Sequence, residues 1–498
     1  MRIRRGVVSR GYAVRRSATV LVVAVLALGG YGAADVYDVV PGILTRDRPT
    51  PLPAPATPGP TPTPVALPTA AAAIPVLAAL ADDAPVPSTA ALKKALDAAV
   101  ADPALGPSVG VSIRDAATGK ELYARGADAP RVIASAQKIL AAVAISSELD
   151  PRARMTTEVR MVAPGELVLV AGGDTLLARE AGDPDATAGR VGLRDLAEQV
   201  AAAVGEEPVE RWTVRLDLTY AAGPGYPDTP TYPTGWAPGD VAAGFTQTVA
   251  MIGLADERPK PYEPSPMDPA ASVLDAFVGE LQRAIPDATV TADDIPDLRA
   301  TPAPTEATVV ARGQSAAYRD VLAEALDTSD NALTENLARQ AALQAGRDGS
   351  FADNAAFVVD TLKAKGYDLT GTTLLDTSGL TRGQTSTAAL LSQVTAEALA
   401  GKLPGLQDVI ARLPVAGLDG TLFDRFRTEP ANAAAGVARA KTGTLTGISS
   451  LVGTTVDADE RELTFVIVAD QVPASSGTLA ARAALDRFVA TLTACGCR

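Results

Sequence analysis

The sequence predicts an α+β fold in which strands from both ends of the folded region complete one sheet. Near the start of that region, residues 109–113 alternate between apolar and small or polar side chains, as in a β-strand. Near its end, residues 448–456 and 463–469 form two apolar runs joined by an acidic turn. The region between, roughly 155 to 310, is rich in proline and glycine and is predicted to be an insertion.

The chain length and the apolar periodicity set the other expected elements. The 498 residues exceed what one hydrophobic core normally organises, so two or more folded units are expected. Ile139, Leu140 and Val143 give an apolar face to a segment with helical periodicity. In chain order we expect a helix near Ser88, a hairpin over 109–123, a helix over 136–149, a strand pair over 448–456 and 463–469, and a final helix over 477–494.

The N-terminus has the pattern of a targeting segment. Six arginines precede residue 17, and the run from 17 to 34 carries no charge. That run is about as short as an apolar stretch that crosses a bilayer, for which ~20 residues are typical. It predicts a cleaved signal peptide or an uncleaved signal anchor, with the rest of the chain extracytoplasmic and the membrane as a partner.

A linker is predicted after this segment. Residues 45–72 are dense in proline, threonine and alanine, which favours extended conformations without a packed core. We therefore divide the chain into a basic N-terminus with the signal segment (1–44), a linker (45–82), the first part of the main domain (83–155), one or two inserted subdomains (156–312) and the second part of the main domain (313–498).

Composition excludes several kinds of chemistry. The net charge of −14 argues against nucleic acid as a partner, because phosphate binding needs a basic face. No histidine is present, which excludes a Ser-His-Asp or Cys-His system and removes the commonest zinc ligand. The two cysteines, Cys495 and Cys497, stand at the end of the chain, and we assign them no catalytic role. A nucleophile here must be activated by lysine, a carboxylate or a rarer group.

Ser135 and Lys138 form the only S-x-x-K of the chain. Positions three apart lie on one face of a helix, so the lysine amine can approach the serine hydroxyl. A lysine that is desolvated in a cleft loses affinity for its proton and can act as a general base. By itself the motif is weak, and the alternative is a surface serine and lysine.

Two further short motifs are also unique. Ser329-Asp330-Asn331 precedes a helical pattern, so the alternative is a simple N-cap region. Lys441-Thr442-Gly443 comes just before the last strand pair, and its alternative is a polar turn. A glycine in a strand often marks the close approach of another backbone, which we expect to be a substrate peptide along the strand edge.

The three motifs together carry more weight than any one of them. S-x-x-K, S-D-N and K-T-G in this order are the set found in class A β-lactamases and penicillin-binding proteins. The chain resembles the D-alanyl-D-alanine carboxypeptidase/endopeptidases of the class C (type-4) low-molecular-mass penicillin-binding proteins, the S13 peptidase family, over about 88–494. Further segments that carry the resemblance are 169–174 (L-V-A-G-G-D), 376–382 (D-T-S-G-L-T-R) and 416–422 (A-G-L-D-G-T-L). Thr377 and Thr175 depart from the family pattern, where glycine and proline are usual.

The resemblance implies a fold. The expected main domain is β-lactamase/transpeptidase-like, with an antiparallel sheet, the terminal helices on one face and a helical subdomain on the other. A smaller, mainly β insertion should lie between the first and second motifs. No metal and no organic cofactor is implied.

The resemblance also implies roles for single residues. Ser135 would attack the penultimate D-alanine carbonyl, and Lys138 would take its proton. Ser329 would pass the proton to the leaving amine with help from the charge of Lys441. Asn331 would bind the substrate amide.

The strand that follows Lys441 would hold the end of the substrate. Thr442 and Thr444, on either side of Gly443, would bind the terminal carboxylate. The backbone N–H groups of Ser135 and Thr444 would form the oxyanion hole.

The implied partners are peptidoglycan stem peptides ending in D-Ala-D-Ala, with β-lactam antibiotics as inhibitors. Three other functions compete with a D-Ala-D-Ala peptidase: a serine β-lactamase or esterase, a catalytically silent wall-binding module, and a tethered surface protein. The intact motif set argues against the last two. The sequence leaves open whether carboxypeptidase or endopeptidase action is preferred.

Overall fold

The computed structural model describes residues 84–205 and 209–496, which belong to one compact unit. The signal segment predicted over 1–44 and the linker predicted over 45–82 lie outside the described residues, as does Cys497. Within the described ranges, no helix has the length and apolar character needed to cross a membrane.

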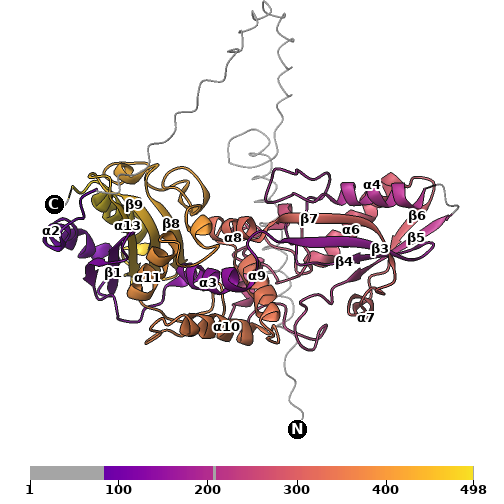
Figure 1. Ribbon diagram of the computed structural model, residues 1–498, viewed down its shortest axis with the longest axis horizontal. Helices are drawn as coiled ribbons and strands as arrows, with labels where there is room; N and C mark the ends of the chain where they lie inside the picture. Colours follow the sequence, from indigo (N-terminus) through magenta and orange to yellow (C-terminus); the bar gives the residue numbers. More distant parts are fainter. Residues whose placement is uncertain (1–83, 206–208, 497–498) are drawn as a thin grey trace, which may run out of the picture. The chain divides into compact units, whose positions relative to one another are not determined.

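The first sheet joins the two ends of the folded region, as predicted. Its strand order is β2-β1-β10-β9-β8, and every pair is antiparallel (Figure 1). Val109 pairs with Ala469, so an early strand and a late strand lie side by side at the centre. The bounds are β1 Val109–Asp115, β2 Glu121–Arg125, β8 Arg439–Leu445, β9 Ile448–Val456 and β10 Glu462–Ala469.

Both faces of this sheet are buried. In β10, Phe465 and Ile467 pack into a core with α2 (Thr89–Val100) and α13 (Gly477–Thr493). Val466 and Val468 alternate with them and enter the core on the opposite face. This double burial explains why β10 is an almost continuous apolar run.

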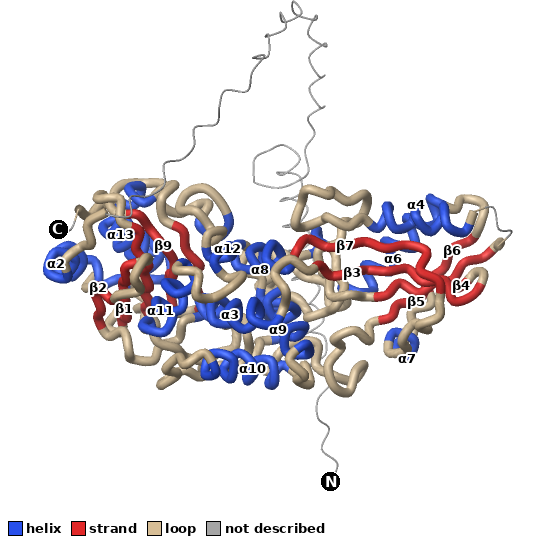
Figure 2. The backbone as a smooth tube through the Cα atoms, in the orientation of Figure 1, coloured by secondary structure: helices blue, strands red, loops and turns tan. Residues whose placement is uncertain are grey.

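A helical subdomain covers that opposite face (Figure 2). Its central helix α3 is buried along most of its length by Ile139, Leu140 and Val143, the residues predicted to form its apolar face. Its helices are α3 Lys138–Glu148, α8 Tyr318–Asp327, α9 Asn331–Gln344, α10 Phe351–Ala364, α11 Ala388–Leu399 and α12 Gln407–Ile410.

The inserted region contains a second sheet with strand order β6-β5-β4-β3-β7. Strand β3 pairs antiparallel with β4 and β7, whereas β4-β5 and β5-β6 are parallel. Parallel neighbours need crossover connections, which α4 and α6 provide. The sequence analysis did not anticipate these two helices. The bounds are β3 Arg154–Ala163, β4 Glu166–Val170, α4 Leu193–Val204, β5 Arg211–Asp217, α6 Pro269–Ala284, β6 Thr289–Ala292 and β7 Thr308–Ala317.

Short helical segments connect these elements. The helix expected from 136 begins at Lys138 instead, because residues 134–137 form a separate 3₁₀ turn. The short segments are η1 Pro103–Leu105, η2 Ala134–Gln137, α5 Pro238–Ala242, η3 Ala255–Glu257, α7 Pro296–Arg299, η4 Gly420–Leu422 and η5 Ala431–Ala434.

Candidate active site

Ser135 lies in the 3₁₀ turn η2, directly before α3. The preceding residue, Ala134, has φ 50°, a left-handed conformation that costs energy for a residue with a Cβ. Such strain persists only where the surroundings hold the backbone in place, and it occurs often at functional sites. The turn places Ser135 at the N-terminal end of α3.

Lys138, the first residue of α3, is completely buried. Its Nζ donates to Ser135 Oγ (3.1 Å), Asn331 Oδ1 (2.6 Å) and the carbonyl oxygen of Ser378 (2.8 Å). Burial lowers the pKa of Lys138 to about 8, although the nearby carboxylates Asp376, Asp330 and Glu335 favour its charged form. The amine can therefore release its proton near neutral pH.

The S-D-N motif occupies the start of α9. Asp330 caps the helix by accepting from Leu333 N–H (2.9 Å), so the expected N-cap interpretation also holds. Asn331 is the first helical residue, and its Nδ2 donates to the carbonyl oxygen of Phe245 (2.9 Å). Ser329 is half-buried with φ 60°, and its side chain has no hydrogen bond to any described residue.

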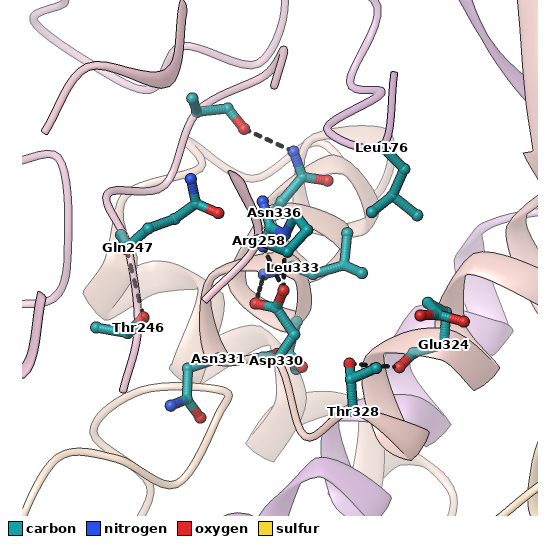
Figure 3. A network of polar contacts seen from close by, with 12 residues as sticks. Leu176, Thr246, Gln247, Arg258, Glu324, Thr328, Asp330, Asn331, Leu333 and Asn336 are labelled. Carbon is teal, nitrogen blue, oxygen red and sulfur yellow. Dashed lines mark hydrogen bonds and ion pairs between the residues drawn. The ribbon is translucent and has the colours of Figure 1, made fainter. Parts of the chain in front are cut away.

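A loop of the inserted region lies against this helix start, as Figure 3 shows. Arg258 forms an ion pair with Asp330, with Nη2 and Oδ2 2.6 Å apart. Asn336, further along α9, donates to the carbonyl oxygen of Ala250 (2.8 Å). The loop also supplies the Phe245 carbonyl, so the insertion takes part in building the site. The sequence carried no motif that would have predicted these contacts.

Strand β8, at the edge of the first sheet, carries Lys441, Thr442, Gly443 and Thr444. Lys441 is completely buried and donates to the carbonyl oxygen of Thr442 (2.8 Å). Burial lowers its pKa, and the charge of Lys138 lowers it further. Thr442 Oγ1 donates to Thr421 Oγ1 (3.1 Å), whereas Thr444 is exposed.

Gly443 is close to another backbone, but that backbone belongs to the chain itself. A Cβ at this position would lie 2.5 Å from the carbonyl oxygen of Ile133 and would overlap Ser450 Oγ. The expectation that the glycine makes room for a substrate peptide therefore needs correction. Gly443 instead lets the turn that carries Ser135 pack directly on β8.

Glu335 and Asp376 are two buried carboxylates that the sequence analysis did not single out as functional. Glu335 Oε1 accepts the backbone N–H groups of Thr377 (2.8 Å) and Ser378 (3.0 Å). It thereby holds the segment whose Ser378 carbonyl accepts from Lys138. Burial, together with the charge of Asp376, raises the pKa of Glu335 to about 7. The position of Glu335, one helical turn after Asn331, is the signal that could have identified it.

Asp376 is fixed by several donors. Its Oδ2 accepts from Trp236 Nε1 (2.9 Å), a side chain of the inserted region, and from Thr381 N–H (2.6 Å). Its Oδ1 accepts from Gly379 N–H (2.7 Å) and Gln384 Nε2 (2.8 Å). These bonds order the loop that borders Ser135.

The structure thus brings Ser135, Lys138 and Asn331 into one hydrogen-bonded group. Ser329 and Lys441 have no hydrogen bond to that group among the described residues. In the part of the chain that the structure describes, no cluster of three or more His, Cys, Asp or Glu side chains is suited to bind a metal ion.

Comparison with known proteins gives consistent matches. The family model of the D-Ala-D-Ala carboxypeptidase 3 (S13) family matches residues 92–261 and 258–492. Carboxypeptidase DacB of Mycolicibacterium smegmatis is 34% identical over 424 residues, which cover 83% of this chain and 86% of that protein. A D-alanyl-D-alanine carboxypeptidase of an Actinomadura species is 31% identical over 440 residues, covering 76% and 80%.

A solved structure shares the fold. Penicillin-binding protein 4 (dacB) of Haemophilus influenzae matches with a TM-score of 0.61 at 17% identity, over 80% of this chain and 98% of that one. This confirms the predicted α+β, β-lactamase/transpeptidase-like class. Because the family model spans nearly all of the described residues and two relatives exceed 30% identity over most of their length, the chain belongs to the D-Ala-D-Ala carboxypeptidase 3 (S13) family.

Proposed function

We propose that this D-Ala-D-Ala carboxypeptidase trims peptidoglycan stem peptides through an acyl-enzyme on Ser135. The observation that carries the proposal is the position of the fully buried Lys138, whose Nζ lies 3.1 Å from Oγ of the half-buried Ser135. With a pKa of about 8, roughly a tenth of the lysine is neutral at pH 7 and able to accept a proton. Asn331 and the Ser378 carbonyl hold the amine in place.

In the first step, Ser135 Oγ attacks the carbonyl carbon of the penultimate D-alanine while Lys138 takes the hydroxyl proton. The peptide bond then breaks, and the leaving amine of the terminal D-alanine receives a proton through Ser329. Water attacks the resulting ester, returns the serine hydroxyl and releases the shortened peptide. When Lys441 is protonated, its positive charge favours the proton transfer toward the leaving group.

The edge of β8 is the proposed binding surface for the substrate backbone. At the start of β8, the Ala440 N–H donates to the carbonyl oxygen of Pro414. Further along the strand, residues 442–445 make no backbone hydrogen bond on the outer edge to any described residue. An extended peptide can pair with such an edge. Thr442 and Thr444 would bind its terminal carboxylate, and the N–H groups of Ser135 and Thr444 would stabilise the oxyanion.

The location of the substrate requires action outside the cytoplasm. We infer that the segment 1–44 supplies the signal peptide or the signal anchor that the arginine-rich start suggests. The Haemophilus influenzae protein has been solved with a bound β-lactam. We propose that β-lactams also acylate Ser135 here, because their strained amide can replace the D-Ala-D-Ala bond.

A fluorescent penicillin tests the mechanism. The full-length protein is mixed with it, the adduct is followed by intact mass over time, and D-alanine release from a D-Ala-D-Ala peptide is measured in parallel. We expect a persistent single adduct that Ser135→Ala abolishes together with D-alanine release. Retention of either activity in that variant would contradict the nucleophile assignment. A rapidly lost adduct would favour a β-lactamase, and no adduct would favour a silent binding module.

A further inference from the structure

Arg339 is a buried cation that forms no hydrogen bond and no ion pair with the residues that the structure describes. Its side chain lies on α9 about two turns beyond Asn331, and the residue is only 5% exposed. Its Nε has no hydrogen-bond partner, and the guanidinium has no hydrogen bond or ion pair with any residue in the described ranges. A buried unpaired charge costs several kcal/mol in typical proteins, so a compensating group is expected.

Two adjoining cavities meet at this side chain. One has a volume of about 280 Å³ and the other about 300 Å³, and Arg339 lines both of them together with Ala222, Thr229 and Pro230. Their remaining walls are mostly apolar, including Met251 and Pro269 in the first and Leu375 in the second. An apolar cavity with one well-placed charged group is typical of a small-molecule site.

The guanidinium is held in a fixed plane. Arg339 Cζ lies 4.3 Å from the centre of the Phe351 ring, an arrangement that orders the group without neutralising it. On another side, a Cβ at Gly223 would lie 3.8 Å from Cζ, and Gly223 has φ +84°. The glycine therefore keeps this approach to the guanidinium free of a side chain.

Other charges in the cavity do not compete for a ligand. Asp268 and Arg299 also line the first cavity, but they form an ion pair with Nη1 and Oδ2 2.7 Å apart. Burial lowers the pKa of Arg339 to about 10, which still leaves it charged at neutral pH. Glu335, one turn earlier on α9, favours the charged form of Arg339 but forms no ion pair with it. Arg339 is therefore the charged residue of the cavity walls that forms no ion pair with a described residue.

We propose that Arg339 and these cavities form a second binding site, separate from Ser135, for a small organic carboxylate. A planar guanidinium binds a carboxylate through two parallel hydrogen bonds, and a monoanion suits a single cation. The mostly apolar walls favour a carboxylate over the more strongly hydrated phosphate. Two carboxylates follow from the proposed function: released D-alanine and the stem peptide that remains.

Calorimetric titration of the full-length protein tests this site. Benzylpenicillin first acylates the catalytic centre, and D-alanine, the tetrapeptide L-alanyl-γ-D-glutamyl-L-lysyl-D-alanine or inorganic phosphate is then titrated. We expect saturable binding of D-alanine or of the tetrapeptide, and the probe that binds distinguishes the two sources. Arg339→Met should weaken that binding at least about tenfold, whereas Arg283→Met, which removes an exposed arginine on α6, should leave it unchanged.

Stability provides a second readout. Without ligand, Arg339→Met should unfold at a higher temperature than the natural protein, because it removes an unpaired buried charge and keeps the contact with Phe351. Arg339→Lys keeps the charge but not the planar guanidinium, so this variant should bind the carboxylate with intermediate affinity. It replaces the methionine variant if Arg339→Met does not fold. The site is refuted if no carboxylate binds, if Arg339→Met does not weaken binding, or if only phosphate binds. Failure of penicillin to acylate would instead contradict the proposed mechanism, and the titration would still report on Arg339.

Discussion

Lys138 Nζ and Asn331 Oδ1 lie 2.6 Å apart, so the first residues of α3 and α9 are hydrogen-bonded to each other. Asn331 Nδ2 donates a hydrogen bond to the carbonyl oxygen of Phe245 in the inserted region. Its amide orientation is therefore fixed from both sides. One asparagine connects the amine beside Ser135 with a loop that the catalytic motifs do not include.

The acylation rate should rise with pH. In the proposed mechanism Lys138 must lose its proton before it can accept one from Ser135, and burial lowers its pKa to about 8. The second-order rate of penicillin acylation should therefore increase about tenfold per pH unit below 8 and level off above it. Stopped-flow fluorescence from pH 5.5 to 9 measures this profile. A rate that does not change with pH would exclude Lys138 as the base.

Replacement of Glu335 should move that profile. The Glu335 carboxylate favours the charged form of Lys138, so Glu335→Gln should lower the pKa of the lysine and shift the rate profile to lower pH. The glutamine oxygen still accepts the N–H groups of Thr377 and Ser378. Glu335→Ala leaves those two buried donors unpaired and should lower the free energy of unfolding by about 2–3 kcal/mol. An unchanged profile in the glutamine variant would contradict the coupling.

Gly443→Ala should damage the site with a smaller effect on the sheet. The added Cβ would meet the Ile133 carbonyl at 2.5 Å and push the turn that carries Ser135 away from β8. Displacement of the nucleophile by about 1 Å should slow acylation roughly 100-fold. Gly279→Ala is the matched control, since its Cβ meets no atom within 4 Å, and it should acylate normally. Equal acylation rates in both variants would refute this packing argument.

Arg258→Met should reveal how the insertion supports the site. It leaves the buried Asp330 without its ion-pair partner, so the free energy of unfolding should fall by about 3 kcal/mol. Because Asp330 precedes Asn331, acylation should slow as well. Arg179→Met removes the two partly exposed ion pairs of Arg179 with Asp256 and Glu257 in the same region and should cost about 1 kcal/mol. Denaturant unfolding and penicillin acylation measure both effects, and equal losses in the two variants would argue against a special role of Arg258.

The sequence predicted β1, β2, β9 and β10 of the main sheet from their periodicity, and the approach of Lys138 to Ser135 from the spacing of one motif. It did not predict the contact of Asn331 with Lys138, because that contact joins two helices that are distant in the chain. It did not predict α4, although Leu193, Leu196, Ala197, Val200 and Val204 have helical spacing. The proline and glycine content of the surrounding region obscured that pattern. Phe245 and Arg258 could not be predicted, because their roles depend on where an irregular loop packs.

The pairing of β1 with β10 has a consequence for the order in which the chain becomes active. The sheet of the inserted region uses strands between Arg154 and Ala317 only, so its hydrogen bonds can form early in synthesis. The first sheet instead needs β8, β9 and β10, which are made last, and contacts between such distant segments form slowly. A growing or truncated chain that lacks residues beyond Arg439 has Ser135 but neither its neighbouring strand nor Lys441. Hydrolytic activity is therefore expected only once the chain is nearly complete.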